Sequence, residues 1–313
     1  LGDNILPNKE NSFLASVFFG PKHTGVAFLD ISTGEFYMAQ GDDRYVDKLI
    51  SNLSPKEVLY QRGYEDRFQA SFGNRLYTYR LDDWIFSSEL NYDKLCKQFG
   101  TKSLKGFGVD GLQEGIAAAG AILYYLEFTE HREISHITSI SRIDQNEFVW
   151  IDKFTIRNLE LFSSNGSQGK SGFADVIDRT LTSMGGRLLK RWIAMPLVDV
   201  ERIRRRQDVV EIFTKDADLA EALREQISAI GDLERISSRI AAGRILPREL
   251  VQLKNSLTAV EMLKALLEST DHERLHEIAS TIDPITELRD KLAREIYPDP
   301  ANNQIQKGGI IAD

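Results

Sequence analysis

The hydrophobic pattern of the chain changes once, near residue 130, and this change limits the possible folds more than any other feature. Over residues 11–37, short runs rich in Phe, Val and Ile are separated by Gly, Pro and Ser-Thr-Gly turns, which predicts two or three antiparallel strands. Apolar residues at helical spacing over 43–53 predict a helix, and a short apolar run over 57–60 predicts another strand. Alternating strands and helices predict an α/β domain over residues 1–130.

The second half of the chain has a different period. Residues 112–128 predict an amphipathic helix that closes the first domain. After a short piece expected to be extended (146–162), apolar residues recur at helical spacing almost to residue 297. Asp199 and Asp216 are expected N-caps. We therefore expect a mostly α-helical domain over residues 131–313.

Length and composition agree with two domains in a reducing compartment. At 313 residues the chain exceeds the size of one ordinary domain. It has no apolar run of about 18 residues and no basic leader, and its single cysteine, Cys96, cannot form an internal disulfide. We expect a cytoplasmic protein that does not span a membrane. A start at Leu1 rather than Met leads us to expect a piece of a longer polypeptide.

The charge of the chain argues against a dedicated DNA clamp, because the net charge is -8 at pH 7. One segment is an exception, with seven basic residues between positions 187 and 206: Arg187, Lys190, Arg191, Arg202, Arg204, Arg205 and Arg206. Two interpretations stay open for this basic run. It either contacts phosphates or forms ion pairs with nearby carboxylates, for which Asp208, Glu211, Asp232 and Glu234 are available.

The segment SNGSQGKSG at 164–172 resembles a phosphate-binding P-loop. That motif needs G-x-x-x-x-G-K-[ST], so that backbone amides surround the phosphates and the lysine reaches the terminal ones. Lys170 and Ser171 match its end, but Ser164 occupies the position of the first glycine. We expect a Gly/Ser loop that only imitates the motif. A nucleotide-binding enzyme that uses the 164–171 loop is the alternative hypothesis.

Acidic and histidine residues offer weaker candidates for a metal site. Asp30, near the end of an expected strand, would belong to a two-metal nuclease only if it converged with pairs such as Asp42-Asp43 or Asp82-Asp83. His272 and His276 lie four residues apart, but no third ligand is evident for zinc. We therefore expect no metal ligand, catalytic residue or cofactor-binding residue in this chain.

Several longer motifs carry a resemblance that spans essentially the whole chain. They are GVAFLDISTGEF (25–36), TIRNLELF (155–162), DRTLTSMGGRLLKRWIAMPL (178–197), IRRRQDVVE (203–211) and DLERISSRIAAGRILPREL (232–250). In these the chain resembles the MutS family of bacterial DNA mismatch-repair proteins. The resemblance implies an RNase H-like connector domain over 1–130. It also implies the first part of a helical core (lever) domain over 131–313, which ends before the clamp domain.

The resemblance also implies a role. Family members recognise mismatched duplex DNA through a Phe-x-Glu motif, hydrolyse ATP with Mg²⁺, form homodimers and bind the MutL partner protein. Phe128-Thr129-Glu130 matches the letters of the Phe-x-Glu motif but ends the expected helix of 112–128, so we do not assign that role to it. The mismatch-reading, clamp and ATPase domains are expected outside this chain. It would then be a non-catalytic coupling and partner-docking module, not itself an enzyme.

Five residues are expected to hold helix junctions in the second domain. Trp192 is expected to be a core anchor, and the polar residues expected to fix helix ends are Arg206, Asp208, Arg235 and Arg244. The sequence does not identify residues that bind DNA.

Overall fold

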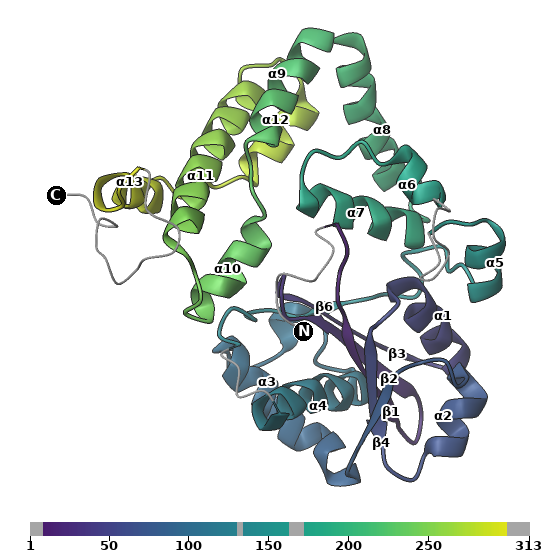
Figure 1. The fold of residues 1–313 in the computed structure, drawn as a ribbon. Helices are drawn as coiled ribbons and strands as arrows, with labels where there is room; N and C mark the ends of the chain where they lie inside the picture. The colour runs from purple at the N-terminus through teal and green to yellow at the C-terminus, as the bar shows by residue number, and fades with distance from the viewer. Residues whose placement is uncertain (1–8, 130–133, 163–171, 299–313) are drawn as a thin grey trace. The chain divides into compact units, whose positions relative to one another are not determined.

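The computed structural model describes residues 9–129, 134–162 and 172–298. Contacts divide the chain into two compact units, which are described separately below. The first unit comprises Leu1–Asp178 and Leu189–Val198, and the second comprises Arg179–Leu188 and Asp199–Asp313. Figure 1 traces the elements of each unit by colour and label.

A mixed β-sheet forms the centre of the first unit. Within the described residues it has six strands in the order β5-β4-β1-β2-β3-β6. The strands are β1 (Leu14–Phe19), β2 (Thr24–Asp30), β3 (Glu35–Gly41), β4 (Glu57–Gln61), β5 (Thr78–Leu81) and β6 (Ser141–Arg142). The first three are antiparallel, β4 is parallel to β1, β5 is parallel to β4, and β6 is parallel to β3. The predicted α/β pattern, with its antiparallel strands, is confirmed.

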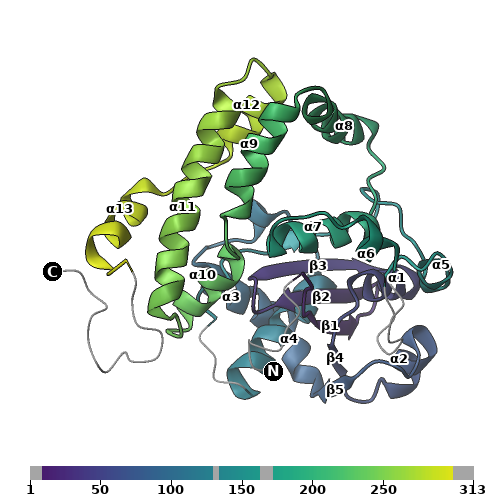
Figure 2. The ribbon, with the colours of Figure 1, turned by 45° about the horizontal axis from the view of Figure 1, so that its top comes forward.

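Helices cover both faces of this sheet, because the strands are apolar on both sides. In β1, Ala15 and Val17 belong to one apolar cluster and Leu14 to another. The helices α1 (Asp43–Leu53) and α2 (Glu65–Phe72) pack on the first face. The opposite face is covered by α3 (Ser88–Phe99) and α4 (Gln113–Thr129), which Figures 1 and 2 show. Two short helices, η1 (Asp83–Phe86) and η2 (Lys105–Phe107), pack into the same apolar cluster.

Helix α4 differs from the amphipathic helix expected over 112–128. It occupies nearly the same residues, but it is buried on almost every side because it packs against both the sheet and α3. Small residues permit this approach: a Cβ added at Gly25 of β2 would lie 1.9 Å from the Glu114 carbonyl oxygen. A Cβ added at Gly120 would lie 2.2 Å from Asn91 of α3.

The first unit also extends past the boundary expected at residue 130. Ile134, Ile137 and Ile140 are buried in the apolar cluster beneath α4, and β6 adds a strand beside β3. The piece expected to be extended over 146–162 instead contains helix α5 (Lys153–Asn158), followed by α6 (Phe173–Ile177). The contacts of the three isoleucines and of β6 join residues far apart in sequence, so local periodicity did not show that they belong to the first unit.

The second unit is helical, as predicted. Its elements are the first part of α7 (Ser183–Ala194), then α8 (Val200–Lys215), α9 (Ala217–Ser228), α10 (Leu233–Ala241), α11 (Pro247–Glu268), α12 (Glu273–Ser280) and α13 (Thr286–Glu295). Helix α11 contacts α9, α10, α12 and α13. The predicted N-caps are confirmed, since the carboxylate of Asp199 accepts from the Arg202 amide and that of Asp216 from the Leu219 amide. None of the helices in the described parts is long and apolar enough to cross a membrane.

Helix α7 is shared by the two units. The division falls within this helix: its residues up to Leu188 belong to the second unit, and its residues from Leu189 onward belong to the first.

Candidate functional site

Arg187 of α7 is the centre of a buried ionic cluster in the second unit. The residue is 2% exposed. Its Nη1 and Nη2 atoms donate to the two carboxylate oxygens of Asp232 at 2.8 and 2.7 Å, and its Nε donates to Glu234 Oε2 at 3.2 Å. Burial alone lowers the pKa of Arg187, but these hydrogen bonds and charges more than offset it and raise the pKa. The guanidinium therefore stays charged and holds α7 to the N-terminal end of α10.

Other members of the basic run also have carboxylate partners. Lys190 donates to Glu10 at 3.0 Å, and Arg191 pairs with Glu35 and lies 5.4 Å from the ring centre of Tyr37. Arg204 pairs with Glu201 on the surface of α8. With Arg187, at least four of the seven basic side chains pair with carboxylates of the described residues, which favours ion pairing over phosphate contact at these four positions.

The residues expected at helix junctions lie in varied surroundings. Asp208 of α8 accepts a hydrogen bond from Nε of Arg274 on α12 at 3.4 Å, so this pair joins two helices. Arg235 is buried, with its Nε 3.8 Å from Asp232. Burial, and then the charge of Arg202, lower the pKa of the half-buried Arg206.

Two of these expected residues lie nearer the surface. Arg244 is exposed. Trp192 is 41% exposed and is therefore not the core anchor expected from its sequence neighbours. Its helix, α7, buries the Arg187 side chain instead.

The carboxylate considered for a metal site is already used by the backbone and by neighbouring side chains. Asp30 is fully buried, and its oxygens accept from Asn11 Nδ2, the Ser12 amide, and the amide and hydroxyl of Ser32, at 2.7 to 3.0 Å. The bonds from Ser32 fix the turn between β2 and β3, and those from Asn11 and Ser12 tie the segment before β1 to it. Nowhere in the described ranges do three or more His, Cys, Asp or Glu side chains gather as metal ligands would.

The P-loop-like segment has flanks of the wrong type. Lys170 and the rest of 163–171 lie outside the described residues. A P-loop follows a strand and opens a helix. Here helix α5 and a turn with Glu160 at a φ of 47° precede the segment, and the five-residue α6 follows it. This arrangement does not support a nucleotide site at the loop.

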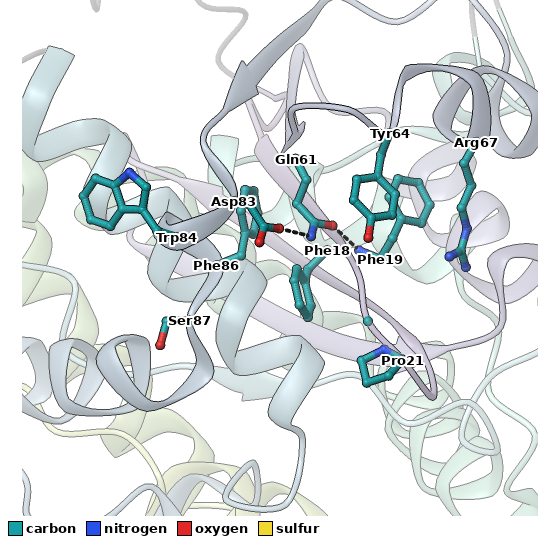
Figure 3. A pocket seen from close by; sticks show the side chains of 11 residues that line it. Phe18, Phe19, Pro21, Gln61, Tyr64, Arg67, Asp83, Trp84, Phe86 and Ser87 are labelled. Atoms are coloured by element: carbon teal, nitrogen blue, oxygen red, sulfur yellow. Dashed lines mark hydrogen bonds between the residues drawn. The ribbon is translucent and has the colours of Figure 1, made fainter.

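A pocket of about 440 Å³ lies where three parallel strands of the first unit end. Phe19 is the last residue of β1, Gln61 is the last residue of β4, and Asp83 follows shortly after β5. In Figure 3, Trp84 and Ser87 lie at one end of this strand-end pocket and Tyr64 and Arg67 at the other. Ligands of open α/β sheets commonly bind at the carboxyl ends of the strands.

A hydrogen-bonded bridge crosses the middle of the strand-end pocket. Gln61 is buried; its Oε1 accepts from the Phe19 amide at 2.7 Å and its Nε2 donates to Asp83 Oδ1 at 2.8 Å (Figure 3). The carboxylate of Asp83 is thereby held in place at the exposed rim. Aromatic rings line the remainder, with Phe18 stacked on Phe86 and Phe19 stacked on Tyr64.

An exposed group of aromatic side chains adjoins this pocket. Trp84 of η1 meets Tyr124 of α4 edge to face at 5.2 Å, and Phe128 stacks on Tyr124 at 4.4 Å. Phe128 is 64% exposed and Trp84 57%. We call Trp84, Tyr124 and Phe128 the aromatic patch. Exposed aromatic clusters are typical of protein interaction surfaces.

Sequence reasoning missed both the aromatic patch and the strand-end pocket. Residues 75–86 have no clear strand or helix period in the sequence, yet they contain β5 and η1. The available signal was the aromatic content of RLYTYRLDDWIF, whose tyrosines and tryptophan are not needed by the core.

Comparisons with known proteins also find two parts in the chain, although the second part begins earlier in the sequence than the second structural unit. Residues 12–138 match the family model described as MutS domain II, and residues 154–313 match the one described as MutS domain III. The protein named DNA mismatch repair protein MutS of Phocaeicola vulgatus is 49% identical over 313 residues, which is 100% of this chain and 36% of that protein. Proteins of the same name from Bacteroides thetaiotaomicron and Flavobacterium johnsoniae are 49% identical over 313 residues and 45% identical over 312, each with 36% of its length covered.

The chain thus spans about a third of the length of the curated relatives it matches, since 36% of each is covered. Its identity to these relatives extends over all or nearly all of its own residues. With two consecutive domain models matched in order, the chain belongs to the MutS family of DNA mismatch-repair proteins.

Proposed function

We propose that this chain is a non-catalytic coupling and partner-docking region of a mismatch-recognition protein. The observation that carries the proposal is the match of both family domains, in order, to a chain whose candidate chemical groups serve its own fold. Asp30 is saturated by hydrogen bonds, and Arg187 is enclosed by carboxylates. Side chains used in this way hold a framework together rather than act on a substrate.

In this proposal residues 1–130 form an RNase H-like connector domain, and residues 131–313 form the first part of the core (lever) domain. The mixed sheet supports the first assignment: three antiparallel strands are followed by two parallel ones, with helices on both faces. The run of helices from α8 to α13 supports the second.

Helix α7 is the element we propose for coupling. Its Arg187 is fixed to Asp232 and Glu234 in the second unit, and one turn later its Arg191 pairs with Glu35 in the first. A hydrogen-bonded helix transmits displacement along its axis better than a flexible linker does. The polar junctions expected from the sequence, above all Asp208 and Arg235, would keep the helices of the second unit moving together.

Mismatch reading and ATP hydrolysis belong, in this proposal, to parts of the longer relatives that this chain does not span. ATP with Mg²⁺ needs a P-loop and metal-binding carboxylates. Ser164 replaces the first P-loop glycine here, and the segment follows a helix and a turn instead of a strand. Binding of mismatched duplex DNA and homodimer formation are likewise proposed for the whole protein.

The docking of MutL is proposed at the aromatic patch of the first unit. Large, exposed aromatic side chains supply most of the binding free energy of many protein interfaces. A charged pair borders the patch: Lys94 Nζ donates to Glu127 at 2.6 Å and lies 5.8 Å from the ring centre of Tyr124. An apolar centre with a charged border is the usual composition of such an interface.

The test compares two phenylalanines of similar exposure. Phe128 in the patch is 64% exposed, and Phe154 on α5 is 60% exposed. We expect Phe128→Ala to weaken binding of purified Bacteroides thetaiotaomicron MutL to the immobilised chain by about tenfold or more, as loss of an interface hot spot does. Phe154→Ala should change the affinity by less than about twofold. Equal affinities of Phe128→Ala, Trp84→Ala and the unmodified chain would refute this location, provided their thermal unfolding is unchanged.

A further inference from the structure

The strand-end pocket contains a carboxylate without a cationic partner. Asp83 accepts a hydrogen bond from Gln61 Nε2, and no positively charged side chain in the described parts of the chain pairs with it. Its neighbours differ in this respect: Asp82 pairs with Arg62 at 3.3 Å, and Asp43 pairs with Arg67 at 3.2 Å. Within the described part of the first unit, the negative charge at the rim is therefore not compensated by an ion pair.

The bridge through Gln61 fixes this carboxylate in position. Gln61 is 2% exposed and uses its oxygen to accept from the Phe19 amide, which leaves its amide nitrogen to donate to Asp83 Oδ1. A side chain held in this way loses little conformational entropy when it pairs with a ligand. Asp83 is exposed, and no described residue donates a hydrogen bond to its other oxygen, Oδ2, which can therefore accept from an incoming donor.

The aromatic walls suit the flat face and the aliphatic stem of a guanidinium side chain. The Arg67 guanidinium already lies 4.6 Å from the ring centre of the buried Phe19, so the lining of this pocket forms a cation–ring contact within the chain itself. Trp84, the best type of ring for a cation, lines the pocket and is exposed. Arginine stacks on aromatic rings and is less strongly hydrated than lysine, so it loses less on entering such a pocket.

We propose that the strand-end pocket binds an arginine side chain of a protein partner, with its guanidinium paired to Asp83 and its stem against the aromatic walls. Charge complementarity selects the occupant, because the carboxylate needs a cation and the rings favour a planar one. Assigning the arginine to a protein partner rests on the docking proposed above. The two sites adjoin, because Trp84 both lines the pocket and contacts Tyr124 of the aromatic patch. The pocket chemistry itself does not depend on it.

Fluorine NMR of the 313-residue chain labelled with 5-fluorotryptophan gives a direct readout. The chain has three tryptophans, and Trp84→Phe identifies the Trp84 resonance. The probe is N-acetyl-arginine amide, titrated at constant ionic strength. The neutral analogue N-acetyl-citrulline amide has the same shape without the charge, and N-acetyl-lysine amide has the charge without the planar group. We expect a saturable shift of the Trp84 resonance with arginine and much weaker effects with the other two.

Adjacent carboxylates provide the matched variants. Asp83→Asn should weaken arginine binding by about tenfold, the usual effect of losing a hydrogen bond to a charged group. Asp82→Asn, which removes the neighbouring charge paired to Arg62, should leave binding within about twofold. The proposal is overturned by no saturable shift, by equal binding of citrulline or lysine, or by an Asp83→Asn variant that binds arginine normally.

MutL binding by Asp83→Asn and Phe128→Ala, together with the arginine probe, separates this proposal from the docking proposal. If the aromatic patch binds MutL but the pocket takes no arginine, Phe128→Ala loses MutL while Asp83→Asn retains it and no probe shifts Trp84. If the pocket is correct and the patch is not, the arginine probe binds and Phe128→Ala leaves MutL binding unchanged.

Discussion

Replacement of Arg187 with Met should destabilise the second unit by about 3 kcal/mol, because it leaves two carboxylates without their buried partner. The guanidinium forms a bidentate pair with Asp232 and two further contacts with Glu234. A single hydrogen bond to a charged group contributes about 1.5 to 3 kcal/mol, and bonds within one cluster are not additive. The Glu234 side chain is 38% exposed and therefore partly solvated. The loss of stability in Arg187→Met should thus be close to that of the Asp232 pair alone.

Arg204 offers the matched comparison, since it pairs with Glu201 while both side chains are 65% and 71% exposed. Arg204→Met should cost less than about 0.5 kcal/mol. Urea unfolding followed by circular dichroism at 222 nm gives the change in unfolding free energy for both variants. In thermal unfolding, Arg187→Met should lower the melting temperature by about 10 °C. Arg187→Lys, which keeps the charge but not the bidentate geometry, should fall between them. A cost below about 1 kcal/mol for Arg187→Met would refute the claim that this cluster holds α7 to α10.

Two further predictions concern the first unit. Gly25→Ala should lower the free energy of unfolding in urea by about 3 kcal/mol, because its Cβ would lie 1.9 Å from the Glu114 carbonyl oxygen. Gly111→Ala, with open space around the new Cβ, should lower it by less than about 0.5 kcal/mol. Equal losses for the two variants would contradict this packing. Burial raises the pKa of Asp43, but hydrogen bonds from two hydroxyl groups and from Arg67 lower it further than that. The ionised Asp43 therefore stabilises the fold above about pH 4 and loses this effect as the pH falls, so unfolding free energy should drop more steeply in acid for the unmodified chain than for Asp43→Asn. Parallel pH profiles would contradict the assignment.

Local patterns in the sequence predicted the elements that depend on local forces. The side chains of the strands over 11–37 alternate between two apolar faces, and the helix over 43–53 has one apolar face. The spacing of apolar residues along the sequence is therefore enough to predict these elements. Asp199 and Asp216 cap helices through bonds to amides three residues away, which sequence spacing also reveals.

Features that depend on distant contacts did not follow from local patterns. Helix α4 carries apolar residues on almost every side, and only its place between the sheet and α3 explains that. Ile134 and Ile137 belong to the first unit because they complete its core, although the periodicity had already changed. The strand-end pocket is formed by the ends of three strands, so no single segment contains its signal.

Trp192 shows a further limit of sequence reasoning. A tryptophan beside Ile193 in a helix is usually buried, yet α7 leaves it 41% exposed while Arg187 is buried with its carboxylates. A fully paired arginine can replace an apolar residue at such a position.

The most direct test of the proposed role is a fluorescence-anisotropy titration of the chain with matched and G·T-mismatched DNA duplexes at low and physiological salt. A coupling and docking region should bind both duplexes weakly and equally, and the binding should disappear as salt rises, because only attraction to phosphates remains. Tighter binding of the mismatched duplex at physiological salt would place a base-reading element within these residues and would contradict the proposal that mismatch recognition lies outside them.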